Sequence, residues 1–144
     1  MSSRSQRRLR GKGRASNGSF LGLPHAVLNH PAFATLSPRA TKLLLDIATQ
    51  YRGKNNGDLC ATLKTLKERG WNSSDQVFKA RDELVERGLI VVSRRGGRNL
   101  CNLYAITWQP IDDCKGKLDI LASNKALNSW KTWKPSCKRG EDEN

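Results

Sequence analysis

The side chains in this sequence that are best suited to bind another molecule are its arginines and lysines. The chain has 26 Lys and Arg against 13 Asp and Glu, which gives a formal net charge of +13 and an isoelectric point near 10.1. This excess favours a polyanionic partner. Several of the basic side chains lie near the N-terminus, in a segment without acidic residues: Arg4, Arg7, Arg8, Arg10, Lys12 and Arg14.

Residues 1–19 hold these side chains among Ser, Gly, Gln and Asn, with almost nothing apolar. Such a segment cannot bury enough surface to offset the entropy lost on ordering, so we expect a disordered basic arm. The arm would attract phosphates through counterion release, and residues 10–14 would also fit a narrow minor groove. A tail that only increases solubility is the alternative interpretation.

Residue types that catalyse reactions or ligate metals do not occur at recognisable spacings. The chain has no Gly-rich phosphate loop, and neither His25 nor His30 has a nucleophile or a further ligand nearby. The cysteines form no CxxC or Cys/His pair and lie at wide intervals: Cys60, Cys101, Cys114 and Cys137. We therefore expect no enzymatic activity, no metal site and no cofactor.

The length and hydropathy of the chain predict one soluble domain. No apolar run reaches the roughly 18–20 residues that cross a bilayer, and the N-terminus lacks the apolar region of a secretory signal, which predicts a cytoplasmic protein. A chain of 144 residues buries one modest core. We expect a domain over residues 20–110 and a partly disordered extension over residues 111–144.

The first long helix of this domain has clear start and stop signals. Ser37 suits the N-cap, Pro38 suits the first helical position, and Gly53 is expected to end the helix. Apolar residues recur along it at helical spacing: Ala40, Leu43, Leu44, Ile47, Ala48 and Tyr51. Before it, residues 20–36 contain two prolines, which favours short single-turn segments packed on the domain.

A second helix over residues 62–69 is followed by a turn that contains glycine. Gly70 should end this helix in the left-handed conformation, which would direct Trp71 back onto apolar surface. Ser73 then suits the N-cap of a third helix, with Gln76 at the capping-box position. Two helices joined by such a turn are typical of a helix-turn-helix.

The third helix, over residues 73–87, should have one apolar face and one charged face, and Gly88 should end it. The residues expected to face inward are Val77, Ala80, Leu84 and Val85. The residues expected to face solvent are Asp75, Lys79, Asp82, Glu83 and Glu86.

Two strand-like segments, residues 89–93 and 100–108, predict a β-hairpin with a two-residue turn at Gly96-Gly97. That turn would pair Ile90 with Leu103, and Val92 with Cys101. It would also leave three arginines at an exposed tip: Arg94, Arg95 and Arg98. Together the elements predict an α+β, mainly helical domain with a three-helix core and a C-terminal β-hairpin wing.

This arrangement over residues 37–108 resembles the winged helix-turn-helix DNA-binding proteins, including small bacterial, phage or plasmid regulators and replication proteins. The resemblance implies a major-groove contact by the start of the third helix and a backbone or minor-groove contact by the wing. It assigns DNA contacts by position to Ser73, Ser74, Asp75, Gln76, Lys79, Arg94, Arg95 and Arg98. In the arm, the candidate contacts are Arg7, Arg8, Arg10, Lys12 and Arg14.

The function that this resemblance implies is sequence-specific binding of double-stranded DNA by a transcriptional regulator of a bacterial or mobile element, with a homodimer possible. Gln76 suits a bidentate contact to adenine unless capping engages it. The acidic later turns of the third helix would be repelled by phosphates, so contact should be confined to its first two turns. The alternatives are a replication-initiation or origin-binding accessory protein, an RNA-binding protein, or a protein-interaction module.

The C-terminal extension holds Trp130 and Trp133 among lysines. Three interpretations remain open for these rings: docking on the domain, contact with a protein partner such as a second subunit, or stacking on nucleic-acid bases.

Overall fold

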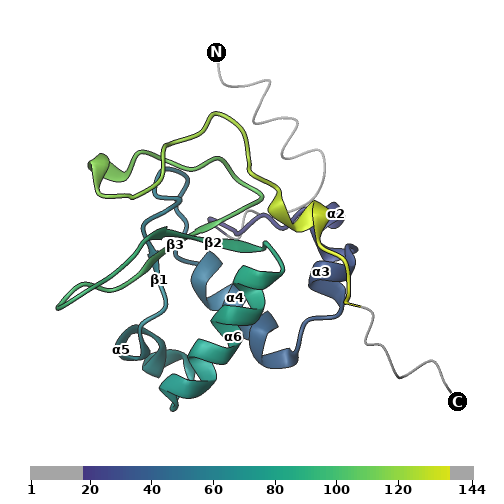
Figure 1. Cartoon of the computed structure of the whole chain (residues 1–144), viewed down its shortest axis with the longest axis horizontal. Helices are drawn as coiled ribbons and strands as arrows, with labels where there is room; N and C mark the ends of the chain where they lie inside the picture. The colour runs from purple at the N-terminus through teal and green to yellow at the C-terminus, as the bar shows by residue number, and fades with distance from the viewer. Residues whose placement is uncertain (1–17, 137–144) are drawn as a thin grey trace, which may run out of the picture.

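The computed structural model describes residues 18–136, which form a small α+β domain with one antiparallel sheet (Figure 1). Two single-turn helices, α2 (His25–Leu28) and α3 (Pro31–Ala34), precede the longer α4 (Pro38–Ala48). The elements that follow, with η for a 3₁₀ helix, are β1 (Leu59–Cys60), α5 (Leu63–Leu66), η1 (Lys67–Arg69), α6 (Ser74–Glu86), β2 (Ile90–Arg94), β3 (Leu103–Ile106), η2 (Cys114–Gly116) and η3 (Ser129–Thr132). The expected α+β class is confirmed.

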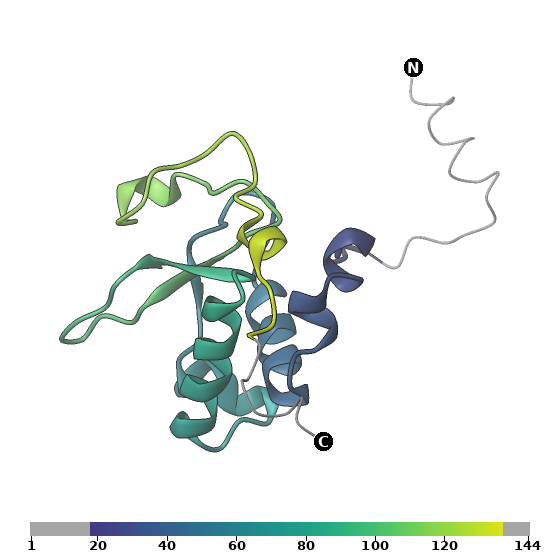
Figure 2. The same cartoon turned by 45° about the vertical axis from the view of Figure 1, so that its right-hand side comes forward.

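The sheet has the strand order β1-β3-β2, so the strand that comes last in the chain lies in the middle. Leu59 of β1 pairs with Tyr104 of β3, and every residue of β3 is buried. Helices α4 and α6 pack side by side below the sheet in both views (Figures 1 and 2). Their apolar faces and the sheet enclose one hydrophobic core.

Helix α4 begins as expected but ends earlier than Gly53. Ser37 is its N-cap, and the Ser37 hydroxyl accepts a hydrogen bond from the Ala40 N–H at 3.1 Å. The helix stops at Ala48, and the Asn55 side chain bonds to two of the backbone groups that follow. The Asn55 amide donates to the Gln50 carbonyl at 2.9 Å, and its oxygen accepts from the Arg52 N–H at 2.6 Å.

The predicted turn and register of the hairpin are wrong. Gly97 and Leu100 exchange two backbone hydrogen bonds of 3.1 Å, which places the two-residue turn at Arg98-Asn99. Asn99 has a φ of 61°, a left-handed conformation that asparagine tolerates well. Gly96-Gly97 was the predicted turn because glycine adopts the positive φ angles of a two-residue turn most readily.

The observed register pairs Ile90 with Ile106 and Val92 with Tyr104, rather than with Leu103 and Cys101. A bulge follows Val92, where the buried Ser93 hydroxyl donates to the carbonyl of Gly57.

Gly96 is needed in the hairpin because the opposite backbone passes close to its Cα atom, and not because it lies in the turn. A Cβ atom at this position would overlap the backbone of the returning strand, lying 2.7 Å from the Cys101 carbonyl carbon. The Gly96 N–H donates to the Asn102 side chain at 2.6 Å. A glycine is therefore needed here although it lies outside the tight turn.

The C-terminal extension docks on the domain. Trp130 is buried, and its ring meets the His30 ring edge-on at a centroid distance of 5.2 Å. The Arg87 guanidinium lies 4.5 Å from the centre of the Trp133 ring, and the Trp133 N–H donates to Glu86 at 3.3 Å. His30 is a packing residue in the structure, since its Nδ1 also accepts from the Ala32 N–H at the start of α3.

Two glycines with the same backbone conformation offer a matched test of this docking. Gly70 and Gly88 follow helices with φ of 91° and 73°, but a Cβ on Gly70 would meet nothing within 4 Å. A Cβ on Gly88 would lie 2.7 Å from the Ser129 carbonyl. We expect Gly70→Ala to cost about 1 kcal/mol of unfolding free energy, the left-handed penalty alone. Gly88→Ala should cost roughly twice that or more, because overlap with backbone adds to the penalty.

Urea unfolding followed by tryptophan fluorescence measures both variants, since the rings of the docked segment report its release. Equal losses in the two variants would contradict the docking of residues 129–133 against Gly88.

Candidate nucleic-acid interface

The turn between the second and third helices forms as its sequence predicts. Gly70 adopts the left-handed conformation after η1, and the Trp71 N–H donates to the Leu66 carbonyl at 3.2 Å. The Trp71 ring is buried in the core. Ser73 then caps α6, with its hydroxyl accepting from the Gln76 N–H at 3.3 Å. The orientation of α6 relative to α5 is therefore fixed by local hydrogen bonds and by one anchored ring.

A buried carboxylate, Asp46 of α4, holds this turn in place. Its side chain is only 4% exposed and accepts from the Trp71 indole N–H at 2.7 Å. It also forms ion pairs of 2.7 Å with Lys42 Nζ and with Arg69 Nε. Lys42 Nζ in turn donates to the Arg69 carbonyl at 2.6 Å. We call these four residues the Asp46 cluster.

The Asp46 cluster sets the ionisation of its carboxylate. Burial alone would raise the pKa of Asp46, but the hydrogen bonds from Lys42, Trp71 and Arg69, together with the Lys42 charge, outweigh it and lower the pKa. Asp46 therefore stays ionised over the physiological range, with each carboxylate oxygen occupied. Its neighbours on the helix, Leu43 and Ile47, are apolar core residues.

The first turns of α6 present polar side chains to solvent. Ser74 and Gln76 are exposed, and the Gln76 side chain makes no hydrogen bond to another residue between 18 and 136. The reciprocal half of the predicted capping box is thus absent, and the Gln76 amide remains available. Lys79 forms an ion pair with Asp75 at 3.1 Å, but their side chains are 70% and 74% exposed, so the pair is weak.

The outer face of α6 differs from the prediction at two residues. Glu83 is not on the solvent face: it is half-buried and accepts from the Ser37 N–H at 2.8 Å, which ties the start of α4 to α6. Val85 does not face inward but is 36% exposed. The helical wheel had placed Val85 on the apolar face and Glu83 on the opposite face, but neither position is central to its face, and there small errors in the helix axis decide burial. Asp75, Asp82 and Glu86 do face solvent.

The hairpin arginines divide into two kinds. Arg95 and Arg98 are exposed, and the hairpin that carries them projects away from the helices (Figures 1 and 2). Arg94 is not at the tip: it is half-buried, and its Nη2 donates to the Cys101 carbonyl at 2.9 Å. Arg94 therefore braces the hairpin. The arm residues Arg7, Arg8, Arg10, Lys12 and Arg14 lie outside the described residues.

Exposed basic residues beside α6 were missed by the sequence analysis. Arg39 at the start of α4 lines a shallow hollow together with Lys79 and Glu83. Lys64 and Lys67 are exposed on α5 and η1, and neither forms an ion pair within residues 18–136. For Lys64 and Lys67, the signal available in the sequence was their position on the polar side of the short helices that precede the turn.

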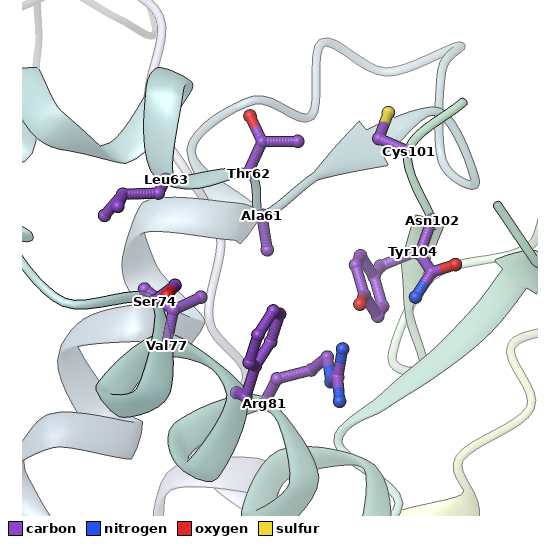
Figure 3. Close-up of a pocket in the computed structure, with 10 residues that line it drawn as sticks. Ala61, Thr62, Leu63, Ser74, Val77, Arg81, Cys101, Asn102 and Tyr104 are labelled. Atoms are coloured by element: carbon purple, nitrogen blue, oxygen red, sulfur yellow. The ribbon is translucent and has the colours of Figure 1, made fainter. Parts of the chain in front are cut away.

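A cleft separates the start of α6 from the base of the hairpin. It is lined by Ala61 to Leu63, by the α6 residues Ser74, Val77, Phe78 and Arg81, and by Cys101, Asn102 and Tyr104. Figure 3 shows the Arg81 and Tyr104 side chains extending toward each other across it. The Arg81 guanidinium lies 4.9 Å from the centre of the Phe78 ring, and Phe78 itself is 51% exposed.

Comparison with protein-family models, with curated proteins and with solved structures finds no match to this chain. Within residues 18–136, no group of three or more His, Cys, Asp and Glu side chains is arranged to hold a metal ion. None of the helices in that part of the chain combines the length and hydropathy needed to span a membrane.

The Asp46 cluster predicts a large loss of stability when its carboxylate is removed. Asp46→Ala leaves the buried Trp71 N–H without an acceptor, so we expect a loss of about 2–3 kcal/mol of unfolding free energy at neutral pH. Asp75→Ala removes an exposed ion pair and should cost less than about 1 kcal/mol. Chemical denaturation of both variants tests this difference, and similar losses would show that the cluster does not hold the turn.

The lowered pKa of Asp46 also predicts a pH dependence. A carboxyl group whose pKa is lower in the folded state contributes stability that is fully present above its unfolded value, 3.8, and is lost as the pH falls through the lower folded value. The wild-type protein should therefore lose more unfolding free energy than Asp46→Ala when the pH falls from neutrality to below 3.8. If the unfolding free energies of the two proteins changed in parallel with pH, the lowered pKa of Asp46 would be contradicted.

Proposed function

We propose that this chain is a winged helix-turn-helix protein that binds double-stranded DNA. The order α4, β1, α5 with η1, α6, β2, β3 and the strand order β1-β3-β2 are compatible with that fold. The observation that carries the proposal is the capped, exposed start of α6, held by the Asp46 cluster beside a projecting hairpin with two exposed arginines. A helix presented in this way fits the major groove.

The side chains at this surface divide the contacts by chemistry. The Gln76 amide suits a bidentate contact to the N6 and N7 edge of adenine, and Ser74 suits a base edge or a phosphate. Arg95 and Arg98 suit phosphates or a narrow minor groove. Arg39 and Lys79, which share one hollow, suit the backbone beside the groove.

The acidic residues of α6 limit the depth of the contact. Asp82 and Glu86 lie two and three turns along the helix on its exposed face, where a phosphate ridge would repel them. Only the first two turns therefore enter the groove in this proposal. Asp75 lies at the very start and is partly neutralised by Lys79.

Base and backbone contacts predict different mutational effects on DNA binding. Duplexes selected from a random pool by the full chain supply the specific site. Gln76→Ala should weaken binding to that site by about tenfold or more and relax its preference at one adenine. Arg98→Ala should weaken specific and non-specific duplexes alike, with a shallower salt dependence.

Arg52→Ala is the matched control, since Arg52 is exposed beyond the far end of α4. Fluorescence anisotropy measures all three variants. Sequence-blind binding that none of the variants alters would exclude the proposed surface, and tighter binding to structured RNA would favour the RNA-binding alternative. A palindromic selected site would support a homodimer over paired half-sites.

The basic arm should contribute measurably to the salt-dependent part of the DNA affinity. Removal of residues 1–15 deletes six basic side chains and no acidic one. If each pairs with a phosphate, the slope of log K against log salt should flatten by up to about 5. An unchanged slope would mean that the arm makes no phosphate contacts.

A protein-interaction module is the second candidate, because Phe78 is 51% exposed and Val85 is 36% exposed on an otherwise acidic face of α6. It predicts a stable protein partner and only weak, salt-sensitive affinity for any duplex. For the DNA-binding protein, the biological role that we propose is regulation of transcription in a bacterial or mobile element, with an accessory role in replication as the alternative.

A further inference from the structure

The cleft between α6 and the hairpin base has the size and composition of a small-molecule site. Its volume is about 290 Å³, near the lower end of the range for ligand pockets. Its walls are largely apolar, from Ala61, Val77 and the rings of Phe78 and Tyr104. Ser74 and Asn102 place a hydroxyl and an amide at its edge. Such a mixture of apolar walls and few polar groups orients a ligand.

The exposed ring in this lining, Phe78, favours a planar ligand. The Arg81 guanidinium lies 4.9 Å from the centre of the Phe78 ring, and this ring is 51% exposed. The Tyr104 ring faces them from β3, and Figure 3 shows it beside Arg81. An aromatic ring that enters the cleft would find the exposed Phe78 ring as a stacking surface, while Tyr104, which is only 2% exposed, closes the cleft from the side of β3.

The charge of the lining favours an anionic ligand. The residues that line the cleft include Arg81 but no acidic residue. Arg81 donates through Nε and Nη2 to a single oxygen of Asp82, at 3.1 Å and 2.9 Å, and the Asp82 side chain is 70% exposed. The Arg81 side chain itself is 23% exposed, and its bonds to Asp82 use only part of its five N–H donors, which leaves donors for a second anion from the cleft side.

We propose that this cleft binds a small planar aromatic molecule that carries a carboxylate or similar anionic group. The ring lies against the exposed Phe78 ring, and the anion pairs with the Arg81 guanidinium. Ser74 starts α6, and Asn102 accepts the Gly96 N–H at 2.6 Å, so the ligand touches both elements assigned to DNA. If the proposed DNA-binding function holds, an occupied cleft therefore also changes duplex affinity.

Titration of the full chain with naphthalene carboxylate, followed by amide NMR shifts, tests the site without DNA. We expect saturable shifts at Ala61, Ser74 and Asn102. Arg81→Gln should weaken the carboxylate by about tenfold, while naphthalene carboxamide should bind wild type and Arg81→Gln alike. Arg52→Gln, at an exposed arginine away from the cleft, is the matched control and should bind the carboxylate as wild type does.

Absence of saturable shifts up to the solubility limit, or saturation elsewhere on the surface, would overturn the proposal. Equal weakening of the carboxylate and the carboxamide by Arg81→Gln would overturn the assigned pairing. These readouts need no nucleic acid, so they separate failure of this site from failure of the DNA-binding proposal. In a parallel anisotropy titration, a duplex affinity that stays unchanged at saturating carboxylate would overturn the coupling.

Discussion

The ionised side chain of Asp46 is the constraint on which the arrangement of the helices depends. A carboxylate in a core of leucines and isoleucines is costly unless it is fully paired, and here Lys42, Arg69 and Trp71 all bond to it. Arg69 and Trp71 lie on either side of Gly70, so the turn between the helices is attached to α4 at both of its edges. The position of α6 follows from that attachment.

A second interaction between α4 and α6 is a hydrogen bond further along the same helices. Glu83 accepts from the N–H of Ser37, so the N-terminus of α4 is fixed to the middle of α6. The C-terminal extension adds two further contacts to the domain, because Trp130 packs on His30 and Trp133 packs on Arg87. These contacts use several charged and aromatic residues for structure. The groups left exposed beside the start of α6 are Ser74, Gln76, Lys79 and the nearby Arg39, and those of the hairpin are Arg95 and Arg98.

The elements that the sequence predicted well are those defined by neighbours along the chain. Gly70, Ser73 and Gly88 act within a few residues of their partners, so local preferences were sufficient to place them. Asp46, Glu83 and Arg94 depend on partners that only the fold brings near, and their roles were missed or misassigned. Lys42, which lies four residues before Asp46 and therefore on the same face of the helix, was the indication of the cluster within the local sequence. The hairpin register failed because Gly96 is required by close approach to the returning strand, which has no local signature.

The surface assigned to DNA is tested most directly by mapping amide shifts during titration of the full chain with a selected duplex. Binding through the start of α6 and the wing predicts the largest shifts at residues 74–79, in α6, and at residues 95–99, in the loop between β2 and β3. Shifts confined to other surfaces, or shifts at the exposed Phe78 and Val85 only with a protein partner and not with any duplex, would contradict DNA binding by this face.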